Sequence, residues 1–274
     1  MALSPGETPL PQPTNSRRAV PATIVFVTGF PARFSERLAL LEDRIAAACR
    51  RANRSRDELR LMAVSKLHPA EAIAEAVAAG HTLFGENRVQ EFEAKRARLH
   101  ELGVTGAEVH LIGHLQSNKT TKAAALFDAI DSVDSLRIAE RLNDAAADSA
   151  NPLPILIELK LSDEATKTGL DPASPELSEL LDRLPALPHL ALCGLMTIAP
   201  LDDNPETARA CFRGLRTLRD SLARNYPALD FRELSMGMSG DFEVAIEEGS
   251  TLIRVGTALF GDRPKPKPQT QTAP

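Results

Sequence analysis

The stretch LRLMAVSKLHPAEAIAEAVAAG, residues 59–80, contains one complete strand-then-helix unit and so decides the fold. Its first part, LRLMAV, is a short apolar run, which is typical of a strand that is covered on both faces. Pro69 stands at the first turn of the helix predicted after it, and Gly80 marks the end of that helix. A strand followed directly by a helix is the unit from which parallel sheets are built.

The same unit recurs along the chain. The predicted strands span residues 59–64, 82–87, 108–113, 129–133, 154–161, 190–198, 231–235 and 251–260. The predicted helices span residues 35–51, where Ser35 is the expected N-cap, 69–80, a charged segment ending near 100, 117–127, 135–147, 175–183, 205–225 and 241–248. Strands alternating with helices in this number predict an α/β fold, a single closed (β/α)8 TIM barrel. A doubly wound open sheet is the rival, but the sequence lacks its GxGxxG turn.

The barrel is expected to occupy residues 34–263. An extension at residues 1–33 precedes it, and the tail PKPKPQTQTAP, residues 264–274, follows it. Both are expected to be disordered because of their proline-rich composition.

The composition argues against several classes of function. A net charge of −5 provides no basic field that would gather nucleic acid or anionic lipid. Aromatic residues make up only 4% of the chain and Trp is absent, which disfavours a base-stacking surface. No apolar run reaches membrane-spanning length. The three cysteines show no metal-ligand spacing, so we expect no metal site and a reduced, cytoplasmic protein.

Functional residues of a barrel lie at the carboxyl ends of its strands. The first predicted strand ends at Ser65 and Lys66. A lysine there places its amine in a half-buried mouth, where desolvation lowers the amine pKa and frees it to attack carbonyl groups. The alternative is a lysine whose ammonium simply reaches solvent.

Two loops near the end of the chain have the character of phosphate-binding loops. SMGMSGD, residues 235–241, and RVGT, residues 254–257, offer backbone N–H groups beside the hydroxyls of Ser239 and Thr257. The alternative for the first loop is a plain strand-to-helix turn that Asp241 caps. Two such loops opposite a lysine favour a phosphorylated carbonyl ligand.

Six stretches together resemble the pyridoxal phosphate homeostasis protein family: AVSK (63–66), FGENRVQE (84–91), HLIGHLQSNK (110–119), LSDEATKTG (161–169), GLMTI (194–198) and SMGMS with EEGSTLIRVGTALFG (235–261). The resemblance implies a barrel of the alanine racemase N-terminal type that holds pyridoxal 5'-phosphate (PLP) as a Schiff base on Lys66. It places Ser239, Gly256 and Thr257 at the phosphate and Arg254 opposite the pyridine nitrogen. It makes Asn87 a lining residue.

The resemblance also implies a function without catalysis. The expected protein is a monomer that buffers PLP or carries it to apo-enzymes, within vitamin B6 and amino-acid homeostasis. The first alternative is a small PLP-dependent racemase, which needs a second acid/base at the mouth, with His114 or Cys193 as candidates. Tyr226, the only tyrosine, is predicted to lie at the other end of the barrel. The second alternative is an interaction protein that binds no cofactor.

Overall fold

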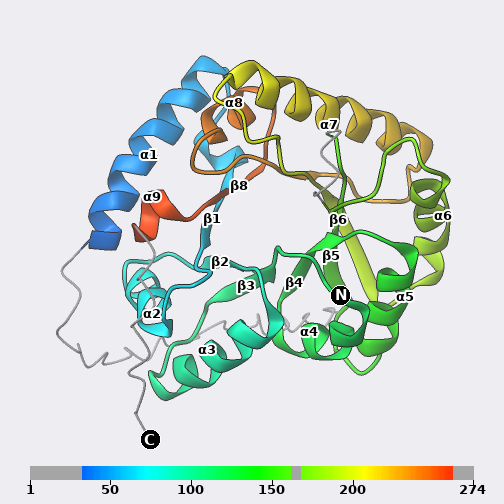
Figure 1. Ribbon diagram of the computed structural model, residues 1–274, viewed down its shortest axis with the longest axis horizontal. Coiled ribbons are helices and arrows are strands. Elements are labelled where there is room, and N and C mark those ends of the chain that lie inside the picture. The colour runs from blue at the N-terminus through cyan, green and yellow to red at the C-terminus, as the bar shows by residue number, and fades with distance from the viewer. Residues whose placement is uncertain (1–32, 162–167, 262–274) are drawn as a thin grey trace, which may run out of the picture.

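Eight parallel strands form a closed barrel in the order of the chain, and helices surround it (Figure 1). This computed structural model describes residues 33–161 and 168–261. The strands are β1 (Arg60–Val64), β2 (Leu83–Glu86), β3 (Glu108–Leu111), β4 (Ala129–Val133), β5 (Leu153–Glu158), β6 (Leu190–Met196), β7 (Glu233–Ser235) and β8 (Leu252–Val255). The predicted (β/α)8 barrel is therefore confirmed.

The helices follow the strands in the predicted alternation. They are α1 (Arg33–Arg51), α2 (Ala70–Ala78), α3 (Val89–Glu101), α4 (Thr120–Leu126), α5 (Leu136–Ala145), α6 (Pro175–Arg183), α7 (Pro205–Asn225), α8 (Phe242–Glu247) and α9 (Thr257–Phe260). Short 3-10 turns span Arg56–Glu58, Ser117–Lys119 and Leu184–Ala186. Among the described residues, no helix is both long and apolar enough to cross a membrane.

The barrel closes where β1 pairs with β8, with Arg60 opposite Leu252 and Ala63 opposite Val255. Outside this seam, α1 packs against both α8 and α9, so the first helix lies beside the last two (Figure 1). Arg51 of α1 binds Glu243 and Glu247 of α8 at 2.9 and 2.7 Å.

Several predicted boundaries differ from the structure, and three of the differences bear on local geometry. The apolar stretch 251–260 is not one strand, because β8 ends at Val255 and the N–H groups of Leu259 and Phe260 bond to the carbonyl of Gly256, which starts α9. Ser35 is not an N-cap, because α1 already begins at Arg33. The predicted helix 117–127 opens with a 3-10 turn before α4.

The predicted extension 1–33 and tail 264–274 lie outside the described residues, apart from Arg33, and so do residues 162–167 of the LSDEATKTG motif.

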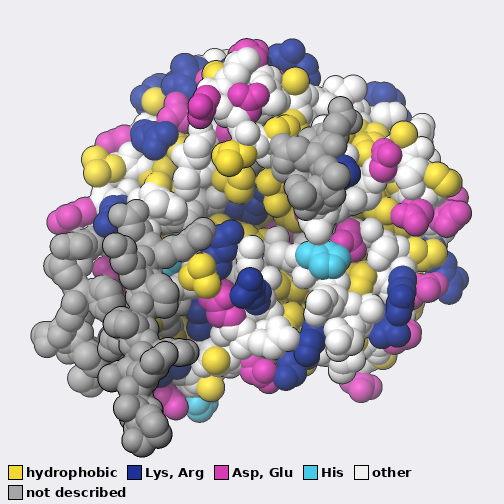
Figure 2. Space-filling model, in the orientation of Figure 1, with side chains coloured by type: hydrophobic (Ala, Val, Ile, Leu, Met, Phe, Trp, Pro, Cys, Tyr) yellow, Lys and Arg dark blue, Asp and Glu magenta, His cyan; other side chains and the backbone are white. Residues whose placement is uncertain are grey.

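The main apolar core lies between the strands and the surrounding helices. A separate small cluster consists of Met62, Leu83 and Leu252, which come from the neighbouring strands β1, β2 and β8. These side chains lie on the strand faces that point away from the surrounding helices, so they fill part of the barrel interior. Much of the remaining interior is charged, and His110, Asp131 and Arg254 are all at most 4% exposed. Figure 2 shows charged side chains of both signs scattered over one face of the molecule, without a broad patch of one sign.

Candidate functional site

The predicted site residues all lie at one end of the barrel. Lys66 follows β1 by two positions, Asn87 directly follows β2, and Ser239 lies in the loop after β7. Arg254 is inside β8 near its carboxyl end, and the pair Gly256 and Thr257 follows that strand. The structure thus gathers the six residues at the carboxyl mouth, which is where a barrel of this type carries its site.

The closing seam brings the lysine strand beside the last loop. A Cβ added to Gly256 would lie 3.2 Å from the carbonyl oxygen of Val64, two residues before Lys66. The loop after β7 is joined to the same seam, since the N–H of Arg254 donates to the carbonyl of Gly237 at 2.9 Å. Residues from opposite ends of the chain therefore form one continuous rim.

Both predicted phosphate loops present free backbone donors. The N–H groups of Ser239, Gly240, Gly256 and Thr257 donate to no other described residue. Gly237 has a φ of +97°, and a Cβ there would lie 2.5 Å from a side chain of α8, so this turn requires glycine. Backbone N–H groups without carbonyl partners are suited to binding an anion.

Asp241 is the N-cap residue of α8, but its carboxylate does not cap the helix. It accepts the N–H of Met238 instead and so closes the SMGMSGD loop on itself. The simple capped turn considered from the sequence does not describe this loop.

The Arg254 guanidinium is fixed in the barrel interior. It is 3% exposed, and it donates to the hydroxyl of Ser235 at 2.7 Å and to the carbonyl of Thr197 at 2.9 Å. Burial lowers the pKa of Arg254, while the nearby carboxylates of Asp131 and Glu158 favour its charged form. Arginine nevertheless stays protonated in proteins, so a rigid cation stands below the mouth.

The backbone directly after Lys66 is strained. Lys66 itself is half-buried, and Leu67 adopts a φ of +64°, the left-handed region. For a residue with a Cβ this costs on the order of 1–3 kcal/mol. Two contacts hold this turn in place: the N–H of His68 donates to the carbonyl of Ser65 at 3.0 Å, and a carboxylate of α3 accepts the N–H of Leu67.

Asn87 lines a cavity of about 360 Å³. Its Oδ1 is buried and has no hydrogen-bond partner among the described residues. Gly113 packs directly on its backbone, since a Cβ there would lie 2.4 Å from the Asn87 carbonyl oxygen. Arg88, His114 and Lys119 also line this cavity.

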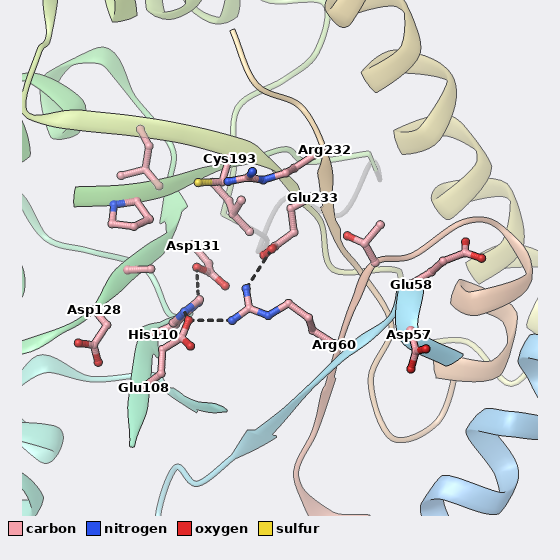
Figure 3. A pocket seen from close by; sticks show the side chains of 15 residues that line it. Asp57, Glu58, Arg60, Glu108, His110, Asp128, Asp131, Cys193, Arg232 and Glu233 are labelled. Carbon is pink, nitrogen blue, oxygen red and sulfur yellow. Dashed lines mark hydrogen bonds and ion pairs between the residues drawn. The ribbon is translucent and has the colours of Figure 1, made fainter. Parts of the chain in front are cut away.

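The structure separates the residues that a racemase would need. His114 is at the mouth, but its Nδ1 lies 2.8 Å from Oδ2 of Asp134. Cys193 does not reach the mouth, because it lines a different cavity at the amino end of the barrel (Figure 3). Tyr226 is the C-cap of α7, which leads into the amino end of β7, as predicted.

That amino-end cavity, of about 490 Å³, contains a network of paired charges. Arg60 binds Glu108 at 2.7 Å and Glu233 at 3.2 Å. His110 lies between Asp131 at 2.9 Å and Glu108 at 2.8 Å, as Figure 3 shows. Most polar atoms of this network are paired with one another, although the buried Oδ2 of Asp131 has no hydrogen-bond partner among the described residues. We assign the network to the stability of the barrel. Among the described residues, no group of three or more His, Cys, Asp or Glu side chains is placed to hold a metal ion.

Sequence reasoning missed three residues behind the rim: Glu86 at the end of β2, with Glu91 and Lys95 on α3. They enclose the turn that carries Lys66, at distances of 2.6 to 2.9 Å. The sequence does contain the relevant pattern, because Glu91 ends the motif FGENRVQE and Lys95 follows it by four positions. An i,i+4 pair of this kind is commonly solvent-exposed, so the pattern by itself indicated no role.

Fold and site define a barrel of the alanine racemase type. The family model for the alanine racemase N-terminal domain matches residues 38–264. The chain is 48% identical over 233 residues to the pyridoxal phosphate homeostasis protein of Escherichia coli K12, covering 82% of this chain and 95% of that protein. The corresponding protein of Aquifex aeolicus is 43% identical, covering 83% and 97%. The chain therefore belongs to the alanine racemase N-terminal domain family and, within it, to the pyridoxal phosphate homeostasis proteins.

Solved structures agree with this assignment. PipY of Synechococcus elongatus PCC7942 with PLP bound is 43% identical, with a TM-score of 0.74, over 83% of this chain and 100% of that one. An alanine racemase of Clostridium difficile 630 shares the fold at 15% identity and a TM-score of 0.63, and the match covers 58% of the racemase chain.

Proposed function

We propose that this protein binds PLP at the carboxyl mouth of the barrel, as a Schiff base on Lys66, and buffers or delivers it in vitamin B6 and amino-acid homeostasis. The observation that carries the proposal is the placement of a half-buried lysine on the same rim as two loops of unpaired N–H groups. The names of the relatives and the PLP bound in PipY support it.

The residues at the mouth fit each part of PLP. The N–H groups of Ser239, Gly240, Gly256 and Thr257 suit a phosphate dianion, and the two hydroxyls add further donors. The unpartnered Oδ1 of Asn87 is a buried acceptor that awaits a donor. When bound, PLP supplies an aldehyde carbon to which an amine can add.

Arg254 argues for a binding role without catalysis. In the proposed arrangement its guanidinium faces the pyridine nitrogen and keeps that nitrogen unprotonated, because arginine only donates hydrogen bonds. An unprotonated ring draws electrons weakly from a bound amino acid. The paired His114 and the remote Cys193 and Tyr226 leave no evident second acid/base among the described residues. We extend the proposal to a monomer in the cytoplasm, where cysteine thiols outside disulfides stay reduced.

We expect the PLP-loaded protein to activate a PLP-requiring apo-enzyme and to racemise no amino acid at an enzymatic rate. The test incubates it with L-alanine in heavy water and follows deuterium at Cα and the D-isomer. Turnover above roughly 1 per second is typical of enzymes and would instead establish a racemase. An apo-enzyme that gains no activity beyond that given by the same amount of free PLP would refute delivery.

Removing both phosphate hydroxyls, Ser239→Ala with Thr257→Ala, should weaken PLP binding by about 1–3 kcal/mol, the range for hydrogen bonds to a charged group. Equilibrium dialysis of PLP against each protein measures the change. The matched control is Ser178→Ala with Thr217→Ala, which removes two exposed helix hydroxyls and should leave binding unaltered. Pyridoxal without its phosphate should bind far more weakly than PLP, and equal affinity for the two would contradict a phosphate site here.

A further inference from the structure

We infer that Lys95, Glu86 and Glu91 form a positioning cluster that holds the backbone on both sides of Lys66 and thereby aims its amine at the ligand carbonyl. The inference rests on the proposed function and names residues that the function itself leaves unassigned. Two of the three side chains are almost wholly buried, with Glu86 at 0% and Lys95 at 8% exposure.

The residue before Lys66 is held by two side-chain contacts from the cluster, besides its backbone hydrogen bonds to Gly85 and His68 at 3.0 Å. Lys95 donates from Nζ to the carbonyl oxygen of Ser65 at 2.9 Å. The hydroxyl of Ser65 donates to Oε1 of Glu86 at 2.7 Å, and the same oxygen accepts from Lys95 at 2.7 Å. Ser65 is fully buried, so its carbonyl and hydroxyl have no water to replace these partners.

The residue after Lys66 is held by the third member of the cluster. Glu91 accepts the N–H of Leu67 at 2.6 Å and pairs with Lys95 at 2.9 Å. The Leu67 side chain is 49% exposed, so packing contributes little to its left-handed conformation. The Glu91 carboxylate adds a side-chain contact to this strained turn, which the N–H of His68 closes by donating to the carbonyl of Ser65 at 3.0 Å.

The Lys95 ammonium is thus linked to the backbone on each side of Lys66. It contacts Ser65 directly, and it reaches Leu67 through Glu91. A small displacement of a reacting group lowers a rate strongly, because reacting atoms must approach to about 3–3.5 Å in a defined direction. A backbone held on both sides fixes the point from which the Lys66 side chain extends. The cluster therefore selects the positions that the amine can reach.

The same geometry prevents Lys95 from competing for the ligand. Its Nζ lies within 2.9 Å of three oxygens, those of Ser65, Glu86 and Glu91, which takes all three N–H groups of an ammonium. An ammonium has no lone pair for a carbonyl carbon. Although Lys95 lies directly behind the mouth, Lys66 is the amine that reacts.

The covalent step needs no other reactant. The Lys66 ammonium and the ligand aldehyde would form a C=N bond. The aldehyde oxygen would leave as water with two of the three ammonium protons, and the third proton would stay on the nitrogen of the protonated imine. Glu86, Glu91 and Lys95 contact neither reacting atom in this scheme, so they are positioning residues. Their loss should slow imine formation without removing the phosphate anchor.

The first test is Lys95→Met in the full chain, which keeps the length of the side chain and removes its donors. Equilibrium dialysis measures total bound PLP, and stopped-flow absorbance with borohydride trapping and peptide mapping measures the rate and site of imine formation. We expect total binding to change less than the imine rate, which should fall about tenfold, within the range for a misplaced reacting group. The control is Lys122→Met. It removes the exposed ion pair between Lys122 of α4 and Glu93, which lies on α3 as Lys95 does. It should react like the unmodified protein.

The second test separates a positioning role from a general effect on stability. It still tests the inference if Lys95→Met does not fold. Glu91→Gln keeps an acceptor for the Leu67 N–H, whereas Glu91→Ala removes it. We expect Glu91→Gln to form the imine within about twofold of the unmodified rate and Glu91→Ala about tenfold more slowly, by the same positional argument. Equal rates in both variants would overturn the inference. An unmodified protein that traps no PLP on Lys66 would instead refute the proposed function, so the two failures are distinguishable.

Discussion

Lys66→Ala should abolish the covalent attachment of PLP. We expect the unmodified, loaded protein to be yellow, with an absorbance band near roughly 420 nm from a protonated imine, and the variant to lack this band. The phosphate loops remain intact in the variant, so weak, reversible binding of PLP should persist. Borohydride followed by peptide mass mapping should find the cofactor mass on the peptide containing Lys66 alone.

The matched control is another lysine at the same mouth. Lys119 lines the cavity beside Asn87, and Lys119→Ala should retain both the band and the mapped peptide. A trapped cofactor on Lys119, or on any lysine other than Lys66, would show that the rim has been assigned incorrectly.

His110→Gln should have the largest effect on stability, lowering the free energy of unfolding by about 3–5 kcal/mol, the range for breaking a buried ion pair by removing one partner. His110 is 4% exposed and bonds to Asp131, which is 1% exposed. The variant leaves the Asp131 carboxylate without its nearest cation. Urea unfolding of both proteins measures the difference.

The same pair predicts a dependence of stability on pH. Burial alone would lower the pKa of His110, but the carboxylates of Asp131 and Glu108 outweigh it and raise the pKa to about 10. The folded pKa lies above the unfolded value of 6.5, so the stabilisation is complete below pH 6.5 and is lost as pH rises through about 10. His110→Gln should flatten the stability profile in this window.

His114→Gln is the control for both measurements. His114 pairs with Asp134 at 2.8 Å, but its side chain is 50% exposed, so its loss should cost at most about 1 kcal/mol. Stability of the unmodified protein that does not change between pH 6.5 and 10 would show that His110 carries no charge in the folded state.

The sequence alone predicted the parts of this molecule that depend on local pattern. Apolar runs alternating with amphipathic segments gave the strand order, and the position of Lys66 after the first run placed it at the mouth. The stretch TLIRVGTALF failed, because its apolar pattern continues through Gly256 whereas the backbone turns there into α9. No local pattern distinguishes a strand that continues from one that stops at a glycine.

The remaining errors concern partners that only the fold brings together. His110 and Asp131 lie in two neighbouring strands, and their pairing follows from the register of β3 on β4. Lys95 is one of many charged residues on α3, and its burial depends on how that helix lies on the rim. Cys193 was a candidate for the mouth because its strand ends there, yet its position within β6 places it at the opposite end.

The seam between β1 and β8 has a consequence for how the protein is made. Lys66 is synthesised early, while Gly256 and Thr257 leave the ribosome among the last of the described residues, and the binding rim needs both ends. A nascent chain can form its first strand-helix units, since folding during synthesis starts from the N-terminus. It cannot form the mouth before β8 has been made, because that strand closes the barrel against β1. Cofactor capture at this mouth therefore requires β8, and a chain truncated before that strand should not form the proposed site.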